Sequence, residues 1–252
     1  RGGDFAECYF ENGDHSSVIL EDQKIEKVIT GSSRGVGLRV VSDQRTVYAY
    51  SNELSPAAMM EMADVVSRAV QRTERGKVIP LVSKTSRFEM PVLIDPHSVE
   101  IRTKVDLVLS VDAAVRSVDR RICQSKVLIL DSHKKVLIAN SLGELAEDER
   151  VSLVAQVQVV ARDGNLIQTG AETLGGAAGY ELFKTEPLEE AARRAAIRAG
   201  LMLKASPAPA GRMPVVLSSR AGGTMIHEAV GHGLESDLVQ QRLSVYSGRV
   251  GD

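Results

Sequence analysis

The chain has 252 residues, of which 43% are hydrophobic and 25% charged, and this composition is typical of a globular protein with a sizeable core. Its 31 Lys and Arg residues stand against 33 Asp and Glu residues, so the formal net charge of -2 does not favour nucleic acid as a partner. Two cysteines, no signal-peptide pattern and no apolar run of membrane-spanning length predict a cytoplasmic protein with no membrane partner.

Alternating apolar residues in the first 51 positions predict an antiparallel meander. The strand-like runs are residues 5–10, 18–20, 25–29, 36–41 and 46–51. Glycines at 31, 35 and 37 lie between two of these runs, whereas a phosphate-binding loop joins a strand to a helix, so that interpretation is rejected. Ser55 and Pro56 then begin a helix that is expected to end near Gly76.

The middle of the chain predicts a second helix, a group of strands and a third helix. Valines recur every three or four positions over residues 98–120, which is typical of a helix with one buried face. Strands are predicted at 127–130, 136–139, 151–159 and 165–169. Consecutive Asp131, Ser132 and His133 cannot converge as a catalytic triad and are interpreted as a turn over residues 131–135. The acidic stretch 144–149 and the glycine-rich stretch 170–179 are interpreted as loops, and Pro187 begins the third helix.

Together these elements predict an α+β fold with two domains. Residues 1–205 form an N-terminal α/β domain with antiparallel sheets and three helices, with possible sub-parts 1–76 and 92–205. The Pro- and Ala-rich segment 206–211 is a linker, and residues 212–252 open a second domain. In that domain a strand at 215–218 is expected to lead directly into a helix.

That helix carries the one pattern that predicts chemistry, His-Glu-Ala-Val-Gly-His at residues 227–232. On a regular helix, histidines five positions apart point about 140° away from each other, too far for both to reach one ion. We therefore predict a turn with i→i+5 hydrogen bonding, for which Gly231 and Gly233 supply backbone freedom. His227 and His232 are then candidate zinc ligands, and Glu228 is the candidate general base for a metal-activated water.

The pattern and its surroundings resemble the TldD/PmbA family of metallopeptidases, formerly called modulators of DNA gyrase. The stretches that carry the resemblance follow one another along nearly the whole chain, at residues 5–10, 33–39, 48–52, 222–223, 227–235 and 247–249. The resemblance implies the N-terminal portion of a cytoplasmic peptidase that acts on unstructured peptides. It also implies a homodimer, or a heterodimer with a related subunit that lacks the motif, and a third metal ligand that is a cysteine downstream of this chain.

The sequence leaves open which residue is the third metal ligand and whether the protein is an enzyme or a peptide-binding subunit. Neither Cys8 nor Cys123 matches the family's cysteine, and Cys8 lies on the apolar face of a predicted strand. Glu235 and Asp237 are possible third ligands, although each is better interpreted as a solvated or hydrogen-bonding group. Without a third ligand these 252 residues alone are expected to be inactive. The alternative function is a non-enzymatic subunit that binds peptide by strand addition at a sheet edge, and an incomplete motif would favour it.

Overall fold

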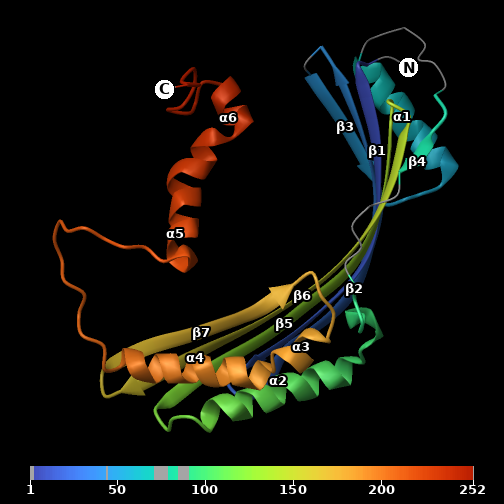
Figure 1. The fold of residues 1–252 in the computed structure, drawn as a ribbon. Coiled ribbons are helices and arrows are strands. Elements are labelled where there is room, and N and C mark those ends of the chain that lie inside the picture. Colours follow the sequence, from blue (N-terminus) through green and yellow to red (C-terminus); the bar gives the residue numbers. More distant parts are fainter. Residues whose placement is uncertain (1–2, 44, 71–78, 85–90, 252) are drawn as a thin grey trace. The chain divides into compact units, whose positions relative to one another are not determined.

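In a computed structural model, the chain divides into two compact units, Arg1–Ala205 and Ser206–Asp252. The structure describes residues 3–43, 45–70, 79–84 and 91–251. The first unit is a sheet that carries helices, and the second is a short run of helical turns (Figure 1). The predicted α+β class is confirmed.

A single sheet forms the frame of the first unit. Within the described residues it has seven strands in the order β3-β2-β1-β5-β6-β4, with β7 paired to β6. The strands are β1 (Phe5–Glu21), β2 (Lys24–Ser42), β3 (Arg45–Ser51), β4 (Val82–Lys84), β5 (Ile122–Asn140), β6 (Glu144–Asp163) and β7 (Leu166–Gly176). The pairs are antiparallel except for β4 with β6, so the prediction of several antiparallel sheets is corrected to one mostly antiparallel sheet.

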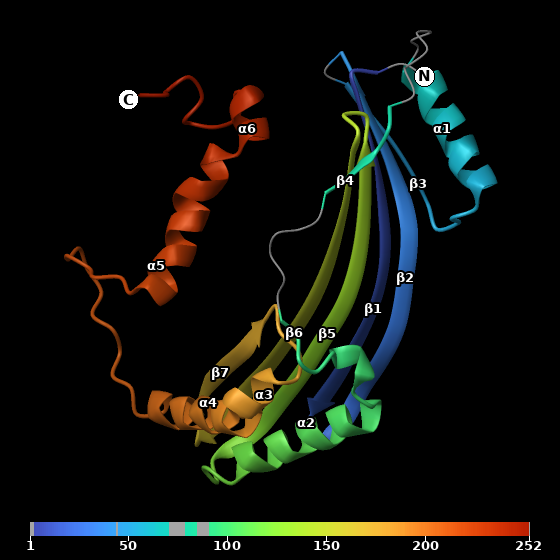
Figure 2. The same cartoon turned by 45° about the vertical axis from the view of Figure 1, so that its right-hand side comes forward.

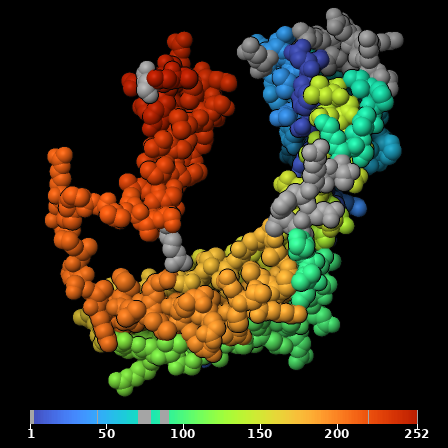
Figure 3. Space-filling model, in the orientation of Figure 1, coloured from blue at the N-terminus to red at the C-terminus, as the bar shows by residue number. Residues whose placement is uncertain are grey.

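The three predicted helices of the first unit are confirmed. They are α1 (Pro56–Val70), α2 (Ile101–Arg116) and α4 (Leu188–Met202), with the short turns η1 (Pro96–Ser98) and α3 (Leu182–Thr185) beside them. The end expected for the first helix near Gly76 lies outside the described residues. Both ribbon views show α2 and α4 side by side against one end of the sheet (Figures 1 and 2). In the space-filling view, α2 (green) and α4 (orange) leave no gap between them (Figure 3).

The core lies between this helical layer and the sheet. It is built from small and branched side chains that are fully buried, including Val18, Val108, Val111, Val115, Ile129, Val157, Ala192, Ala195 and Ala199. The alanines of α4 allow this helix to approach β7 closely. A Cβ atom on Gly170 would lie 2.0 Å from the carbonyl oxygen of Ala195, so the approach requires glycine at that position.

Several strands continue through segments that were predicted to be turns or loops. Strand β5 runs without interruption through residues 131–135, because Asp131 is buried and its carboxylate lies 2.7 Å from Lys104 Nζ of α2. Strand β6 includes the acidic stretch 144–149, where Glu144 pairs with Lys84 and Glu149 with His133. Strand β7 extends to Gly176, so much of the glycine-rich stretch is also sheet.

The second unit begins with an extended segment and not with the predicted strand. Residues 213–218 have no regular structure, and Val216 is 99% exposed. Within the described part of the chain no strand pairs with this segment, so its backbone lacks the ladder that would make it a strand. The segment leads into α5 (Ser219–Ile226), the π-helical turn η2 (His227–Gly231), the 3₁₀ turn η3 (His232–Leu234) and α6 (Ser236–Gln240).

No helix among the described residues is both long enough and apolar enough to cross a membrane.

Candidate metal centre

The two candidate histidines are brought together by a change in helical hydrogen bonding. The helix α5 continues into η2, where the backbone N–H of His232 bonds to the carbonyl of His227, five residues earlier. This is the predicted i→i+5 turn, and it is confirmed. The wider turn reduces the angle between the side chains, and the ring centroids of His227 and His232 lie 4.6 Å apart with the ring planes at 68°.

The two glycines beside His232 have different roles from the one predicted. Gly231 has φ -57° and ψ -51°, which is ordinary right-handed helix, so the expected use of backbone freedom is wrong at this position. Gly233 is needed for space, because an added Cβ atom would lie 2.6 Å from the ring of Tyr246. The hydroxyl of Ser244 also donates a hydrogen bond to the carbonyl of Gly233. The segment at 244–246 therefore contacts the turn that follows His232 and stabilises it.

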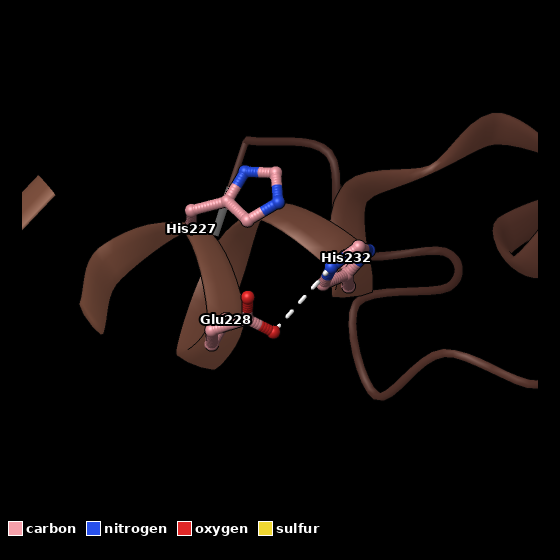
Figure 4. A group of neighbouring side chains, drawn as sticks. All are labelled: His227, Glu228 and His232. Atoms are coloured by element: carbon pink, nitrogen blue, oxygen red, sulfur yellow. Dashed lines mark ion pairs between the residues drawn. The ribbon is translucent and has the colours of Figure 1, made fainter. Parts of the chain in front are cut away.

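His227, Glu228 and His232 form one group at the surface of this unit (Figure 4). Each offers one possible ligand atom, and these atoms lie within 4.8 Å of one another. Ring nitrogens suit zinc as ligands, and an exposed carboxylate beside them could bind the ion or accept a proton. Among the described residues, no other group of three His, Cys, Asp or Glu side chains meets this criterion.

Glu228 lies beside His232 and is exposed. Its Oε2 lies 3.5 Å from Nε2 of His232, the contact drawn as a dashed line in Figure 4. Its side chain is 64% exposed, so water can reach the carboxylate. An exposed carboxylate next to a possible metal position can take a proton from a bound water.

Glu235 interacts with the opposite nitrogen of His232. Its Oε1 lies 2.6 Å from Nδ1 of the ring, and this hydrogen bond is the main reason that the pKa of His232 is raised above its ordinary value. The negative charges of Glu235 and Glu228 raise that pKa further. Glu235 and Asp237 both lie outside the three-residue group. A spacing of three residues on helical turns is the signal in the sequence that indicates the contact between Glu235 and His232.

The other sequence candidates lie in the first unit and do not form a site. Asp131 pairs with Lys104, Ser132 contacts a neighbouring serine, and the ring of His133 lies 2.9 Å from Asp95, so the three consecutive side chains have separate partners. Cys8 and Cys123 are both free thiols. Burial raises the pKa of the Cys8 thiol, and neither cysteine belongs to the three-residue group.

A carboxylate between two helix-borne histidines is the arrangement that metallopeptidases use. Three family models cover most of the chain and agree with this class: PmbA/TldA metallopeptidase domain 1 matches residues 6–72, the central domain 94–203 and the C-terminal domain 210–252. The chain therefore belongs to the PmbA/TldA metallopeptidase family.

Individual relatives support the same assignment. A metalloprotease TldD homologue of Haemophilus influenzae is 31% identical over 263 residues, covering 100% of this chain and 54% of the relative. A metalloprotease of Methanothermobacter thermautotrophicus is 33% identical over 245 residues, covering 94% of this chain and 52% of the relative. The chain thus spans about half the length of these relatives.

Solved structures share the fold at low sequence identity. A Thermotoga maritima protein described as a modulator of DNA gyrase matches with a TM-score of 0.79 at 18% identity, covering 97% of this chain and 55% of that one. TldE of Thermococcus kodakarensis matches with a TM-score of 0.70 at 14% identity, covering 99% of this chain and 56% of that one. At these identities the likeness establishes the fold alone.

Proposed function

We propose that the full-length protein is a zinc-dependent peptidase that hydrolyses unstructured peptides, with His227 and His232 as metal ligands and Glu228 as general base. The observation that carries this proposal is the π-helical turn, which brings two histidines and a carboxylate together on an exposed surface. Such turns cost regular helical hydrogen bonding and often mark functional sites. Membership in a metallopeptidase family supports the same class of reaction.

Each of the three side chains has a distinct task in this proposal. His227 and His232 would hold the ion through one neutral ring nitrogen each. When bound, zinc supplies a water of lowered pKa and polarises the carbonyl of the scissile peptide bond. Glu228 would accept a proton from the attacking water and deliver it to the departing amine, and its exposure and its position beside His232 suit that role.

The remaining parts of the proposal rest on the family resemblance and on the thiols. The third protein ligand is proposed to be a cysteine outside these residues, so the 252 residues alone are proposed to be inactive. The partner subunit is proposed to be either a second copy or a related subunit without the motif. A cytoplasmic location is proposed because both cysteines of this chain are free.

The test is the substitution Glu228→Gln in the full-length protein. We expect hydrolysis of an unstructured reporter peptide to fall by about 10²- to 10⁴-fold, the usual contribution of a general base, while zinc content stays unchanged. Asp237→Asn is the matched control, because it removes a neighbouring negative charge that lies outside the group, and it should leave hydrolysis and zinc content as in the wild type.

Near-normal turnover in Glu228→Gln would show that this residue is not the base. A zinc-loaded wild type that binds the peptide and leaves it uncleaved would favour the non-enzymatic peptide-binding subunit instead.

A further inference from the structure

We propose that Glu235 is a positioning residue for the metal site, which holds the ring of His232 so that Nε2 is the nitrogen presented to the ion. This inference rests on the proposed function, because it assigns a role at the same site. The two nitrogens of the His232 ring contact different carboxylates. Nδ1 lies 2.6 Å from Glu235 Oε1, and Nε2 lies 3.5 Å from Glu228 Oε2.

The hydrogen bond determines which nitrogen carries the proton. An ionised carboxylate can only accept, so the Nδ1–H of His232 donates to Glu235. In a neutral imidazole, a proton on one nitrogen leaves the other free as a ligand, and that nitrogen is Nε2. Nε2 is also the nitrogen on the side of Glu228, within the group that includes His227. The ring therefore offers its free nitrogen toward the candidate metal position.

The backbone around Glu235 holds its carboxylate in place. The residue follows the 3₁₀ turn η3 with φ -63° and ψ 131°, and its N–H bonds to the carbonyl of His232 at 3.3 Å. Its own carbonyl accepts the N–H of Val239 at 3.0 Å, in the first turn of α6. The hydroxyl of Ser244 also donates a hydrogen bond to the carbonyl of Gly233, within the turn between His232 and Glu235. Both ends of the hydrogen bond are thus set by local structure.

A role in folding alone would have different consequences. The side chains of His232 and Glu235 are 50% and 48% exposed, and exposed ion pairs contribute little to stability. By contrast, partners that orient a ligating histidine typically change metal affinity by 10- to 100-fold when they are removed. Metal affinity therefore separates a positioning role from a surface ion pair.

The experiment measures zinc affinity of the full-length protein by competition with a chelator. Glu235→Ala should weaken zinc binding by about 10- to 100-fold with an unchanged melting temperature. Glu235→Gln keeps a carbonyl oxygen that can accept the Nδ1–H, so it should retain more of the affinity. Asp237→Asn, a matched loss of charge two residues away, should bind zinc as the wild type does. In the metal-free protein, ¹⁵N NMR of labelled histidines should show His232 protonated at Nδ1 in the wild type and not in Glu235→Ala.

Two results would overturn the proposal. Zinc affinity of Glu235→Ala within twofold of the wild type, with the same tautomer, would make Glu235 a surface ion pair. Complete loss of zinc, equal to that of His232→Ala, would make Glu235 a ligand itself. These readouts do not depend on hydrolysis. A protein that binds zinc with the predicted order of affinities and cleaves nothing would contradict the proposed function and leave the positioning role intact.

Discussion

Each of the two units contains a short ion pair, and the pair is buried in the first unit and exposed in the second. In the first unit Lys104 and Asp131 lie 2.7 Å apart, and their side chains are only 3% and 4% exposed. In the second unit His232 and Glu235 lie 2.6 Å apart with about half of each side chain exposed. The first unit has a continuous apolar core around its ion pair, whereas none of the described residues of the second unit is buried.

The difference shows how to assign roles to charged groups of similar geometry. Ser16 and Tyr180 also hydrogen-bond to Asp131, so the buried pair is fully partnered inside the protein and joins α2 to β1 and β5. We expect a buried, satisfied pair of this kind to favour one arrangement of the elements that it joins. His227, Glu228 and His232, on the turns η2 and η3, are all exposed, so their possible ligand atoms are accessible, as binding and catalysis require.

The largest expected effect is loss of metal on substitution of a ligand. His227→Ala and His232→Ala should each remove zinc from the full-length protein. A catalytic zinc ordinarily has three protein ligands, and either substitution would leave only two at an exposed site. The described residues of the first unit should keep their protection in hydrogen exchange, since the buried residues of their core all lie between Val18 and Leu203. Simultaneous loss of zinc and of protection in the first unit would contradict this separation of roles between the two units.

The next effect is loss of stability when the buried pair is broken. Lys104→Met leaves the carboxylate of Asp131 buried without its cation, which should cost about 3–5 kcal/mol in free energy of unfolding by denaturant. Lys134→Met is the matched control, because Lys134 forms a 3.0 Å pair with Glu11 that is partly exposed. Its loss should cost about 1 kcal/mol or less.

A double substitution sharpens this prediction. Lys104→Met combined with Asp131→Leu removes both charges, and it should recover a large part of the loss, because paired apolar replacements of buried ion pairs are often tolerated. If Lys104→Met costs no more than Lys134→Met, the buried pair has no special role in the fold.

The smallest effect concerns a partly buried ion pair in the first unit, Asp119 with Arg121. Hydrogen bonds from the Arg121 guanidinium lower the pKa of Asp119 from 3.8 to about 2. A carboxyl whose pKa is lower in the folded state stabilises the fold above pH 3.8, and this contribution is lost as pH falls toward 2. Asp119→Asn should therefore lower the melting temperature slightly at pH 7, with a difference that shrinks between pH 4 and pH 2. A difference that is constant with pH would contradict this assignment.

The fold of the first unit was predictable where apolar periodicity is local. The three helices and the positions of most strands follow from residues spaced by two, three or four. The continuity of β5 was not predictable, because polar Asp131 is accommodated by Lys104, which is 27 positions away in the sequence. The charged start of β6 was missed for the same reason, since Glu149 is paired across the sheet with His133.

The candidate site was predictable to a different extent. The i→i+5 turn follows from the requirement that His227 and His232 meet, and this local geometry needs no distant partner. The role of Gly233 was not predictable, because it depends on the ring of Tyr246, thirteen residues later. The interpretation of Glu235 as a hydrogen-bonding group agrees with the structure, and its spacing of three residues from His232 indicates the partner.

The most direct test of the account is to locate the metal in crystals of the full-length protein by anomalous diffraction at the zinc edge. We predict one zinc peak at about 2.0–2.1 Å from Nε2 of His232 and from a ring nitrogen of His227. Glu228 should lie beside the ion, and Glu235 should remain on Nδ1 of His232. A peak bound elsewhere, or bound through Nδ1 of His232, would contradict the assignment of this turn as the metal centre and of Glu235 as its positioning residue.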